Sequence, residues 1–386
     1  MNKTFLILGG YGNSGRLIAE LLLKETDLKI IISGRDIEKA KALTYSLNQA
    51  YKGDRVSALR ADASDYESLK SVFKKTDLVV VASSTTEYVG NAARAVIETG
   101  IDYLDTQLST KEKLDVLKSL KTDMENTDCC FITDGGFHPG VPAALVRYAA
   151  SNFDQIEKAN IGSVIQLNWK EREFSKSTSL EMIEEFKNYQ PIVYKNGSWI
   201  KLKWKEYLKF NFRLEFGTRL CAPMYLEEMK ALPAIFPSLR ETGFYVAGFN
   251  WFIDYIGIPL VIIALAISEK LTKPLSKFFE WGLKTFSKPP YGTMLTLQAA
   301  GLKNEKHVLL SITLFHKDAY MLTAIPVVAC LLQYLEMGIR KPGLWFQAHF
   351  VDPKKFVKDI QRLGVQILIE QISSLDQISL DNRDIF

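Results

Sequence analysis

Four glycines follow the first apolar run of the chain, in the stretch LILGGYGNSGR. Gly10, Gly12 and Gly15 have GxGxxG spacing, and Gly9, Gly12 and Gly15 fit the looser GxxGxxG form. A strand-to-helix turn around a pyrophosphate needs positive backbone torsion angles and close approach of the ligand to backbone amides, and both favour glycine. Free amides at the start of the helix would bind the phosphates. The stretch predicts a dinucleotide site, although glycines that only shape a tight turn are the alternative. The expected contacts are Gly9, Gly10, Tyr11, Gly12, Asn13, Ser14 and Gly15.

The end of the second expected strand indicates which dinucleotide binds. Ser33, Gly34 and Arg35 stand where an acidic side chain would bind the ribose 2′-hydroxyl of NAD. A carboxylate would repel a 2′-phosphate, whereas a guanidinium donates a planar fork of hydrogen bonds to it and stacks on adenine. NADP(H) is therefore the predicted cofactor. Asp36 follows directly and could serve NAD, but it is better placed to cap the next helix.

Two further loops are expected to contact the cofactor. The third strand ends in RADASD, which places Asp62 and Ala63 where an adenine ring would pass. A cap or loop role is the equal alternative for Asp62. The fourth strand ends in VASSTTEY, and its small polar residues suit a loop beneath the nicotinamide ribose. These residues are Ser83, Ser84 and Thr85.

Hydride transfer needs a cofactor held against the substrate and at most one group that moves a proton. His138, in GGFHPGVP at the end of the sixth expected strand, has an ordinary pKa that suits proton exchange near neutral pH. Asp105 ends the fifth strand and Tyr320 opens a C-terminal helix, so both are further catalytic candidates. Arg147 and Thr323 are candidates for substrate binding. Each candidate also has a purely structural alternative. His138 could be an ordinary loop residue and Asp105 a helix cap. Tyr320 and Thr323 could pack at the start of their helix, and Arg147 could form an ion pair at a domain interface.

Other catalytic designs and partners find no support in the sequence. It contains no GxSxG, no HExxH and no Walker A lysine, which argues against hydrolase, metalloprotease and NTPase chemistry. The four cysteines, Cys129, Cys130, Cys221 and Cys330, lack CxxC spacing, so neither a metal site nor a disulfide framework is expected. The 48 basic and 44 acidic residues are intermixed and leave a formal charge of +4, so no nucleic-acid partner is expected.

Repeated strand–helix units must hold these residues. From Thr4 to Phe131, short β-branched runs alternate with longer amphipathic ones, as is typical of a parallel sheet. The expected strands are Thr4–Leu8, Lys29–Ser33, Val56–Arg60, Leu78–Ala82, Ile101–Leu104 and Cys129–Thr133. The expected helices are Ser14–Leu23, Ile37–Gln49, Tyr66–Phe73, Val89–Thr99 and Lys111–Met124. The pattern predicts a doubly wound α/β sheet of the Rossmann type.

The length of 386 residues suits two domains, and the pattern changes after the helix AALVRYAASNF. The run Ala159–Leu167, aromatic and lysine-rich pieces such as NGSWIKLKWKEYLKF, and the run His307–Phe315 predict a mixed sheet with hairpins. The apolar helix AYMLTAIPVVACLLQYLEMG has to be buried, and the first domain is the expected place. We therefore assign residues 1–150 plus about 319–386 to the NADP-binding domain, and 151–318 to a substrate and dimerisation domain.

One stretch, Trp251–Ile267, is the most apolar of the chain. It contains Asp254 and Pro259, and its charge-free part, Tyr255–Ile267, is shorter than the roughly 18 to 20 residues that span a bilayer. The lysines, leucines and aromatic residues that follow have the spacing of a helix lying in a membrane interface. Residues 251–288 are thus expected to form either domain interior or dimer surface, or a peripheral membrane contact. Cysteine usage and the lack of an N-terminal export signal indicate the cytoplasm.

Several stretches together resemble the saccharopine dehydrogenase-like oxidoreductases, the group around saccharopine reductase and carboxynorspermidine dehydrogenase. These stretches are GGYGNSG, SGRD, AARAVIETGIDYLDT, DGGFHPGVPAALVR and YMLTAIPVVACLLQYLEMGIRKPG. The resemblance implies a Rossmann domain completed by a C-terminal helix, an inserted mixed α/β domain and a homodimer. It also implies that hydride passes between NADP(H) and an imine whose reduction joins two amino-acid-like or polyamine-like parts.

The sequence departs from this family at one informative position. His138 stands where saccharopine reductases carry an acidic residue before the proline, and no arginine pair for two substrate carboxylates is evident. The expected activity is therefore an NADP(H)-dependent oxidoreductase acting on a C–N or C–O bond of an unidentified small metabolite. The alternative is a protein that binds NADP and reports cofactor state to a partner or a membrane without turnover.

Overall fold

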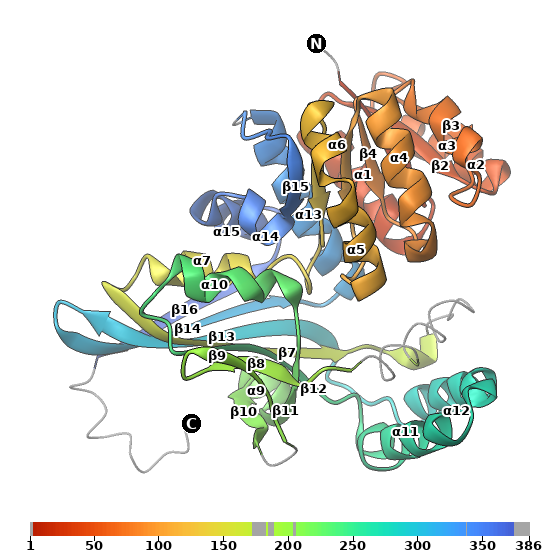
Figure 1. Cartoon of the computed structure of the whole chain (residues 1–386). Coiled ribbons are helices and arrows are strands. Elements are labelled where there is room, and N and C mark those ends of the chain that lie inside the picture. Colours follow the sequence, from red (N-terminus) through yellow and green to blue (C-terminus); the bar gives the residue numbers. More distant parts are fainter. Residues whose placement is uncertain (1–2, 172–182, 184–188, 204–205, 337, 374–386) are drawn as a thin grey trace. The chain divides into compact units, whose positions relative to one another are not determined.

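The chain divides into two units in the computed structural model (Figure 1). The first unit comprises Met1–Ala144 and Tyr320–Gly364, and the second comprises Leu145–Ala319 and Val365–Phe386. The structure describes residues 3–171, 183, 189–203, 206–336 and 338–373.

Seven parallel strands form the sheet of the first unit, in the order β15-β6-β5-β4-β1-β2-β3. The strands are β1 (Thr4–Leu8), β2 (Lys29–Gly34), β3 (Val56–Arg60), β4 (Leu78–Val81), β5 (Asp102–Asp105), β6 (Cys130–Thr133) and β15 (Gly343–Phe346). The doubly wound Rossmann sheet is confirmed, with β15 as an added edge strand. The strand order reverses between β1 and β4, and ligands of such sheets bind at the carboxyl ends of the strands at this point.

Helices cover both faces of this sheet, which is why its strands are apolar on both sides. They are α1 (Asn13–Glu25), α2 (Ile37–Ala50), α3 (Tyr66–Phe73), α4 (Val89–Thr99), α5 (Lys111–Ser119), α6 (Lys121–Asn126), α13 (Ala319–Glu336), α14 (Gln347–Phe350) and α15 (Pro353–Arg362). One core cluster joins Leu6 and Phe131 of the strands to residues of α3 to α6. From α13, Tyr334 packs on the Phe5 ring, at 6.2 Å between centroids, and donates a 2.5 Å hydrogen bond to Asp102.

The long apolar helix, α13, has the length and composition of a membrane span, and no other helix of the described residues does. However, 67% of it is buried, and residues Tyr320 to Glu336 belong to the first unit. A mostly buried helix of this kind is what the core of a globular domain contains, and the burial agrees with the prediction from the sequence.

The segment Lys111–Met124 is not the single helix that the sequence predicts. The structure ends α5 at Ser119 and begins α6 at Lys121. Leu120 between them has φ −96° and ψ 3°, outside the helical range. The bend lets Leu117 and Met124 both reach the same core cluster.

The second unit is built on a mixed sheet of nine strands with the main order β10-β11-β12-β7-β13-β14-β16, while β8 pairs with β12 and with β9. The strands are β7 (Gln155–Gln166), β8 (Ile192–Lys195), β9 (Ser198–Lys201), β10 (Leu208–Asn211), β11 (Thr218–Met224), β12 (Glu241–Ala247), β13 (Gly292–Lys303), β14 (Lys306–His316) and β16 (Gln366–Ser373). The stretch NGSWIKLKWKEYLKF begins with the turn and the second strand of the hairpin β8–β9, whose first strand lies just before it. The turn residues Asn196 and Gly197 both have positive φ, as a type I′ turn requires. The helices are α7 (Pro142–Ala150), which joins the units, and α9 (Arg213–Phe216), α10 (Leu232–Ile235), α11 (Ile258–Ile267) and α12 (Thr272–Thr285).

The C-terminal boundary of the predicted NADP-binding domain is wrong. Residues 365–373 do not stay with the first unit, because β16 pairs antiparallel with β14 along eight residues of the second sheet. The strand β16 carries three consecutive apolar residues, Ile367, Leu368 and Ile369, of which Leu368 and Ile369 are each 45% exposed. This pairing makes β16 the edge strand of the second sheet.

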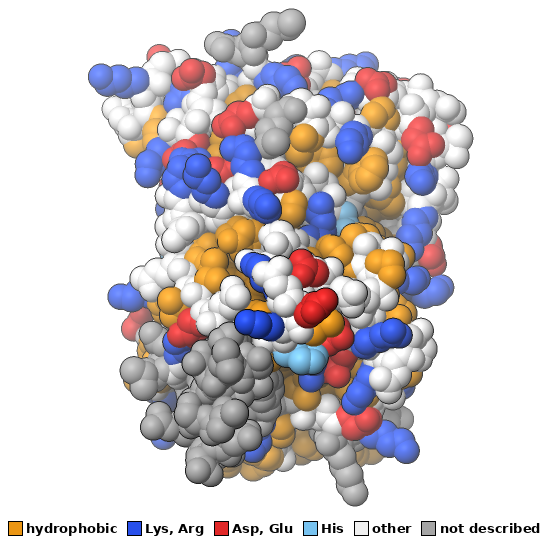
Figure 2. All heavy atoms as spheres, turned by 90° about the vertical axis from the view of Figure 1, so that its left-hand side faces the viewer, with side chains coloured by type: hydrophobic (Ala, Val, Ile, Leu, Met, Phe, Trp, Pro, Cys, Tyr) orange, Lys and Arg blue, Asp and Glu red, His pale blue; other side chains and the backbone are white. Residues whose placement is uncertain are grey.

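Charged side chains of both signs share the face of the molecule drawn in Figure 2. Lysine and arginine lie among aspartate and glutamate on this face, in a chain with 48 basic and 44 acidic residues.

Candidate functional site

The glycine-rich loop after β1 is shaped by backbone contacts that exclude larger residues. The amides of Gly9 and Gly10 both donate to the carbonyl of Ser33, at 2.8 and 3.1 Å. Gly9 has φ +83°, and a Cβ there would lie 2.8 Å from the carbonyl oxygen of Ala82. A Cβ on Gly15 would lie 2.3 Å from the carbonyl oxygen of Gly9, so the helix could not pack this closely on its strand with any other residue.

Helix α1 begins directly behind this loop, and its first amides have no side-chain cap. Gly12 is the N-cap and has no side chain, and the amide of Arg16 is the first to bond within the helix, to Gly12 at 3.0 Å. None of the described side chains caps the amides of Asn13, Ser14 and Gly15. These three donors and the helix dipole favour an anion at this end, so the geometry fits a pyrophosphate.

The end of β2 separates the roles of Arg35 and Asp36. The Asp36 carboxylate accepts hydrogen bonds from two amides in the first turn of α2, each at 3.1 Å, so Asp36 is the helix cap that the sequence predicts. The Tyr11 ring lies over Gly34, where a Cβ would be 2.6 Å from the ring, and its hydroxyl accepts from the Asp36 amide at 3.1 Å. The Arg35 side chain is exposed. Its guanidinium is thus accessible to a 2′-phosphate, while Asp36 is engaged by the helix.

Asp62 shapes the loop after β3. It accepts from the amide and the hydroxyl of Ser64, at 3.1 and 2.8 Å. These bonds, followed by the charges of Arg35 and Arg60, lower the pKa of Asp62. The cap of α3 is Asp65, not Asp62. Asp62 is therefore an ionised loop residue close enough to Arg35 to interact with it.

The loop after β4 lies next to the glycine loop. The hydroxyls of Ser83 and Thr85 are 2.9 Å apart. The amide group of Gln107, a residue that the sequence analysis missed, donates to the Ser83 carbonyl at 2.9 Å and to the Thr85 hydroxyl at 3.3 Å. Ser84 is exposed in the same loop, while Ala63, a predicted adenine contact, is buried in the core cluster.

A buried group of charges lies where β5 and β6 end. Asp105 is fully buried and accepts from Lys113 Nζ at 2.7 Å and from the Thr133 hydroxyl at 2.8 Å. Lys113 also lies 3.1 Å from Asp134, which accepts from the Ser109 hydroxyl at 2.5 Å. Burial raises the pKa of Asp134; burial also opposes the charge on Lys113, but the two carboxylates outweigh it and raise the pKa of that amine. Asp105, a predicted catalytic residue, thus joins strands β5 and β6 to α5.

The sequence analysis did not find Lys113 and Asp134. The available signal was a lysine on the face of α5 that also carries Leu114 and Leu117, both of them buried. A charged residue on a buried helix face requires a buried partner of opposite charge.

His138 lies in the loop after β6, as predicted, but its ionisation differs from the expectation. Burial lowers its pKa to about 4, so the imidazole is neutral near pH 7 and does not exchange a proton there as an imidazolium. The Phe137 ring lies 4.6 Å from the imidazole ring, between centroids. The loop begins at Gly135, whose amide donates to the Asp105 carbonyl at 2.7 Å.

Gln347 of α14, a residue that the sequence analysis also missed, holds this loop. Its side-chain oxygen accepts from the Gly136 amide at 3.2 Å, and its side-chain nitrogen donates to the Gly136 carbonyl at 3.1 Å. A Cβ on Gly140 would lie 2.6 Å from the same nitrogen. Thr323 of α13 is beside the loop, 3.2 Å from where a Gly136 Cβ would be, and Tyr320 is half-buried one turn earlier. The first unit therefore brings Thr323 to the loop that carries His138.

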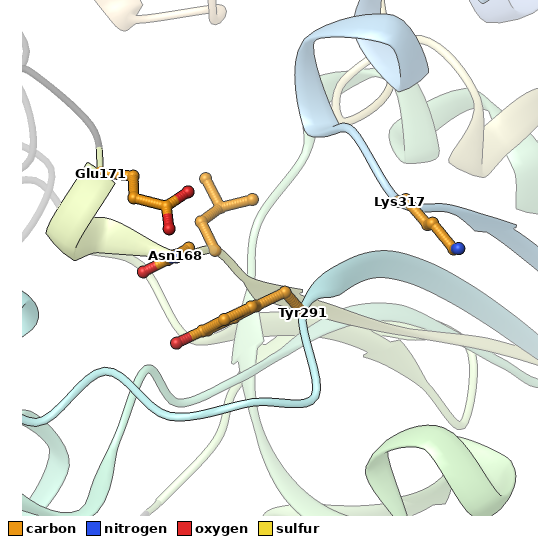
Figure 3. Close-up of a pocket in the computed structure, with 5 residues that line it drawn as sticks. Asn168, Glu171, Tyr291 and Lys317 are labelled. Carbon is orange, nitrogen blue, oxygen red and sulfur yellow. The ribbon is translucent and has the colours of Figure 1, made fainter.

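The second unit contains a cavity of about 310 Å³ (Figure 3). It is lined by Leu167, Asn168, Glu171, Tyr291 and Lys317. Asn168, Glu171 and Tyr291 lie on one side, and Lys317 lies apart from them on the other (Figure 3). Arg147, the predicted substrate-binding arginine, is half-buried on α7 and does not line this cavity. The described residues contain no group of three or more His, Cys, Asp or Glu side chains that could hold a metal ion.

Comparison with known proteins gives two findings. Residues 5–127 match the family model described as saccharopine dehydrogenase NADP binding domain. Apo saccharopine dehydrogenase (L-Glu forming) from Saccharomyces cerevisiae has a similar structure, with a TM-score of 0.69, 12% sequence identity, and coverage of 96% of this chain and 100% of that chain. At this identity the likeness shows the fold alone.

A further solved structure is similar over a smaller part of the chain. It is a short-chain dehydrogenase/reductase from Veillonella parvula in complex with NADP, at 13% identity and a TM-score of 0.28, covering 34% of this chain and 68% of that one. A likeness of this size adds nothing to the assignment of the fold.

Proposed function

Because residues 5–127 form a saccharopine dehydrogenase-type NADP-binding domain, in a chain with the fold of that dehydrogenase, we propose that the protein is an NADP(H)-dependent oxidoreductase. Its substrate would be a small metabolite with a carbon–nitrogen or carbon–oxygen bond at the reacting centre. The observation that carries this proposal is the uncapped start of α1 behind the glycine loop, with the exposed Arg35 at the end of the neighbouring strand.

In this proposal the chain binds and orients while the cofactor supplies the hydride. The amides at the start of α1 hold the pyrophosphate, Arg35 holds the 2′-phosphate, and the loop of Ser83 and Thr85 supports the nicotinamide end. Gln107, in the segment that follows β5, fixes that loop. His138 is a neutral imidazole near pH 7, so it would hydrogen-bond to the reacting amine or hydroxyl and orient it.

The cavity of the second unit supports a substrate that carries both charges. Glu171 would interact with an ammonium group and Lys317 with a carboxylate, at opposite sides of the cavity. This chemistry suits an amino-acid-like metabolite. The four free and buried cysteines support a reducing compartment, the cytoplasm, as the place of the reaction.

Deuterium transfer tests the proposal. NADPH deuterated at the reactive C4 position is incubated with the protein and with pairs of 2-oxo acids or aldehydes and amines, which form imines in solution. We expect deuterium in one product by mass spectrometry, and we expect His138→Gln to lower kcat while leaving the Kd for NADPH unchanged. Tight NADPH binding without transfer to any member of the panel would contradict the proposal.

One observation favours a second candidate, an NADP-binding protein that reports cofactor state without turnover. Of the predicted catalytic residues, Asp105 is fully buried in an ion network and His138 has a pKa of about 4, so neither supplies a proton near neutral pH. For this candidate, NADPH binding should change the affinity of the protein for a partner or a membrane. An oxidoreductase should instead show deuterium transfer without any partner or membrane present.

A further inference from the structure

Exposed apolar side chains concentrate on one part of the second unit. Of the fifteen exposed large hydrophobic side chains in the described chain, nine lie between Trp251 and Trp281. This segment contains the π-helix η5 (Ile253–Gly257), followed by α11 and α12. The two α-helices lie side by side as a hairpin in Figure 1. Such a concentration marks an interaction surface, because monomeric globular proteins rarely expose large contiguous apolar patches.

The inner face of the hairpin is firmly packed. Ile253, Gly257 and Val261, spaced by four residues, are buried. A Cβ on Gly282 of α12 would lie only 2.8 Å from Ile253 Cδ1, so η5 and α12 pack in close contact. Leu275 and other residues of α12 join the same core cluster. The exposed side chains are therefore held on a structured hairpin that is fixed to the domain.

The outer face carries a continuous apolar stripe. Ile256, Leu260, Ile263 and Ile267 are 43, 45, 63 and 78% exposed, and their spacing of three and four residues places them on one side of the helix. A helix that borders water carries polar residues on this side. The charge-free run Tyr255–Ile267 is too short to span a bilayer, for which roughly 20 residues are needed, so the stripe would lie along an interface.

Helix α12 adds lysine and tryptophan on its exposed side. Lys270, Lys273 and Lys277 are exposed, and none of them has an ion-pair partner among the described side chains. Between Ser268 and Lys288 the sequence has five lysines against two glutamates. Trp281 is 51% exposed. Tryptophan is enriched at the level of lipid headgroups, and unpaired lysines are attracted to anionic headgroups.

We propose that the hairpin of α11 and α12 docks the protein on an anionic membrane surface. The stripe from Ile256 to Ile267 enters the headgroup and acyl boundary, and Lys273 and Lys277 contact headgroup phosphates. The charges favour a membrane over a second copy of the chain. A twofold contact through this surface would bring the unpaired lysines of both copies together.

Vesicle flotation of the full chain tests the proposal. Vesicles of phosphatidylcholine alone are compared with vesicles that contain about a third phosphatidylglycerol. We expect the protein to float with the anionic vesicles, and to be released from them by about 0.5 M salt. The double variant Ile263→Ser, Ile267→Ser should lose at least about tenfold in affinity for the vesicles. The double variant Lys273→Gln, Lys277→Gln should lose about as much affinity, and only for anionic vesicles.

A matched control is available in the same unit. Leu220 of β11 is 58% exposed and lies outside the hairpin, so Leu220→Ser should bind vesicles as the wild type does. Near-ultraviolet circular dichroism and the thermal midpoint show whether each variant is folded. The proposal is overturned if the wild type does not float, or if the isoleucine variant floats equally well. It is also overturned if analytical ultracentrifugation shows a dimer that the isoleucine variant dissociates while no form of the protein binds vesicles.

Discussion

At the scale of single residues, the stability of the first unit depends on the buried charge of Lys113. Its ammonium group has no exposure to solvent and lies between the carboxylates of Asp105 and Asp134. Taking these charges out of water is costly, and their attraction together with hydrogen bonds from Thr133 and Ser109 offsets that cost. The result is a rigid support beneath two loops of the candidate site.

Replacing Lys113 with Met should destabilise the first unit. Two buried carboxylates would lose their partner, and breaking a buried pair in this way costs roughly 3 to 5 kcal/mol. Differential scanning calorimetry of the thermal midpoint measures the effect. Lys111→Met is the matched control, because Lys111 is on the same helix with its side chain 84% exposed and should change stability by less than about 0.5 kcal/mol. Equal midpoints for the two variants would show that the buried pair is not needed.

Asp254 predicts a pH dependence in the second unit. Burial raises its pKa to about 6, although the Phe249 amide donates to its carboxylate at 2.9 Å. The folded state thus holds this proton more tightly than the unfolded chain. Its contribution to stability is complete below the ordinary pKa of about 4 and is lost as the pH rises through about 6.

The thermal midpoint of the second unit should therefore fall between about pH 4 and about pH 6.5 and change little above that range. Asp254→Asn keeps a carbonyl acceptor for the Phe249 amide but cannot titrate. It should therefore remove the part of the decrease that Asp254 causes, which is at most about 3 kcal/mol in the free energy of unfolding. Parallel pH profiles for the wild type and the variant would contradict the assignment.

At the scale of elements, the loops of the candidate site are held from segments distant in sequence. Helix α14 supplies Gln347, whose side chain pairs with both backbone groups of Gly136, more than two hundred residues away. Strand periodicity and glycine spacing predict most strands and the loop after β1, because these patterns are local. Gln347, Lys113 and the strand β16 escaped prediction, because their positions depend on contacts that only the folded chain creates.

Gln347→Leu should loosen the loop after β6 without unfolding the sheet. Leu has a similar volume but cannot bond to Gly136, which leaves one buried amide and one carbonyl without a partner and costs about 1 to 3 kcal/mol for each group. Hydrogen exchange of residues 135 to 140 measures the effect. We expect faster exchange there, with exchange in β1 and β4 unchanged. Unchanged exchange in the loop would show that Gln347 does not hold it.

At the scale of the whole molecule, the chain is a parallel NADP-binding unit with an inserted mixed-sheet unit. The sequence predicts both, because alternation of β-branched and amphipathic runs differs plainly from aromatic hairpin segments. It predicts the return of α13 to the first unit from the apolar length of that helix. It does not predict that the chain crosses back at residue 365, since one short strand carries no signal about which sheet it joins.

The most direct test of the account is the affinity for NADPH and NADH, measured by nicotinamide fluorescence, for the wild type and for Arg35→Ala. We expect the wild type to prefer NADPH, because the Arg35 side chain is exposed while the Asp36 carboxylate is bound by amides of α2. Arg35→Ala should weaken NADPH binding roughly tenfold or more and leave NADH binding unchanged. Binding of NADH by the wild type at least as tightly as NADPH, or an equal loss of both cofactors in the variant, would contradict it.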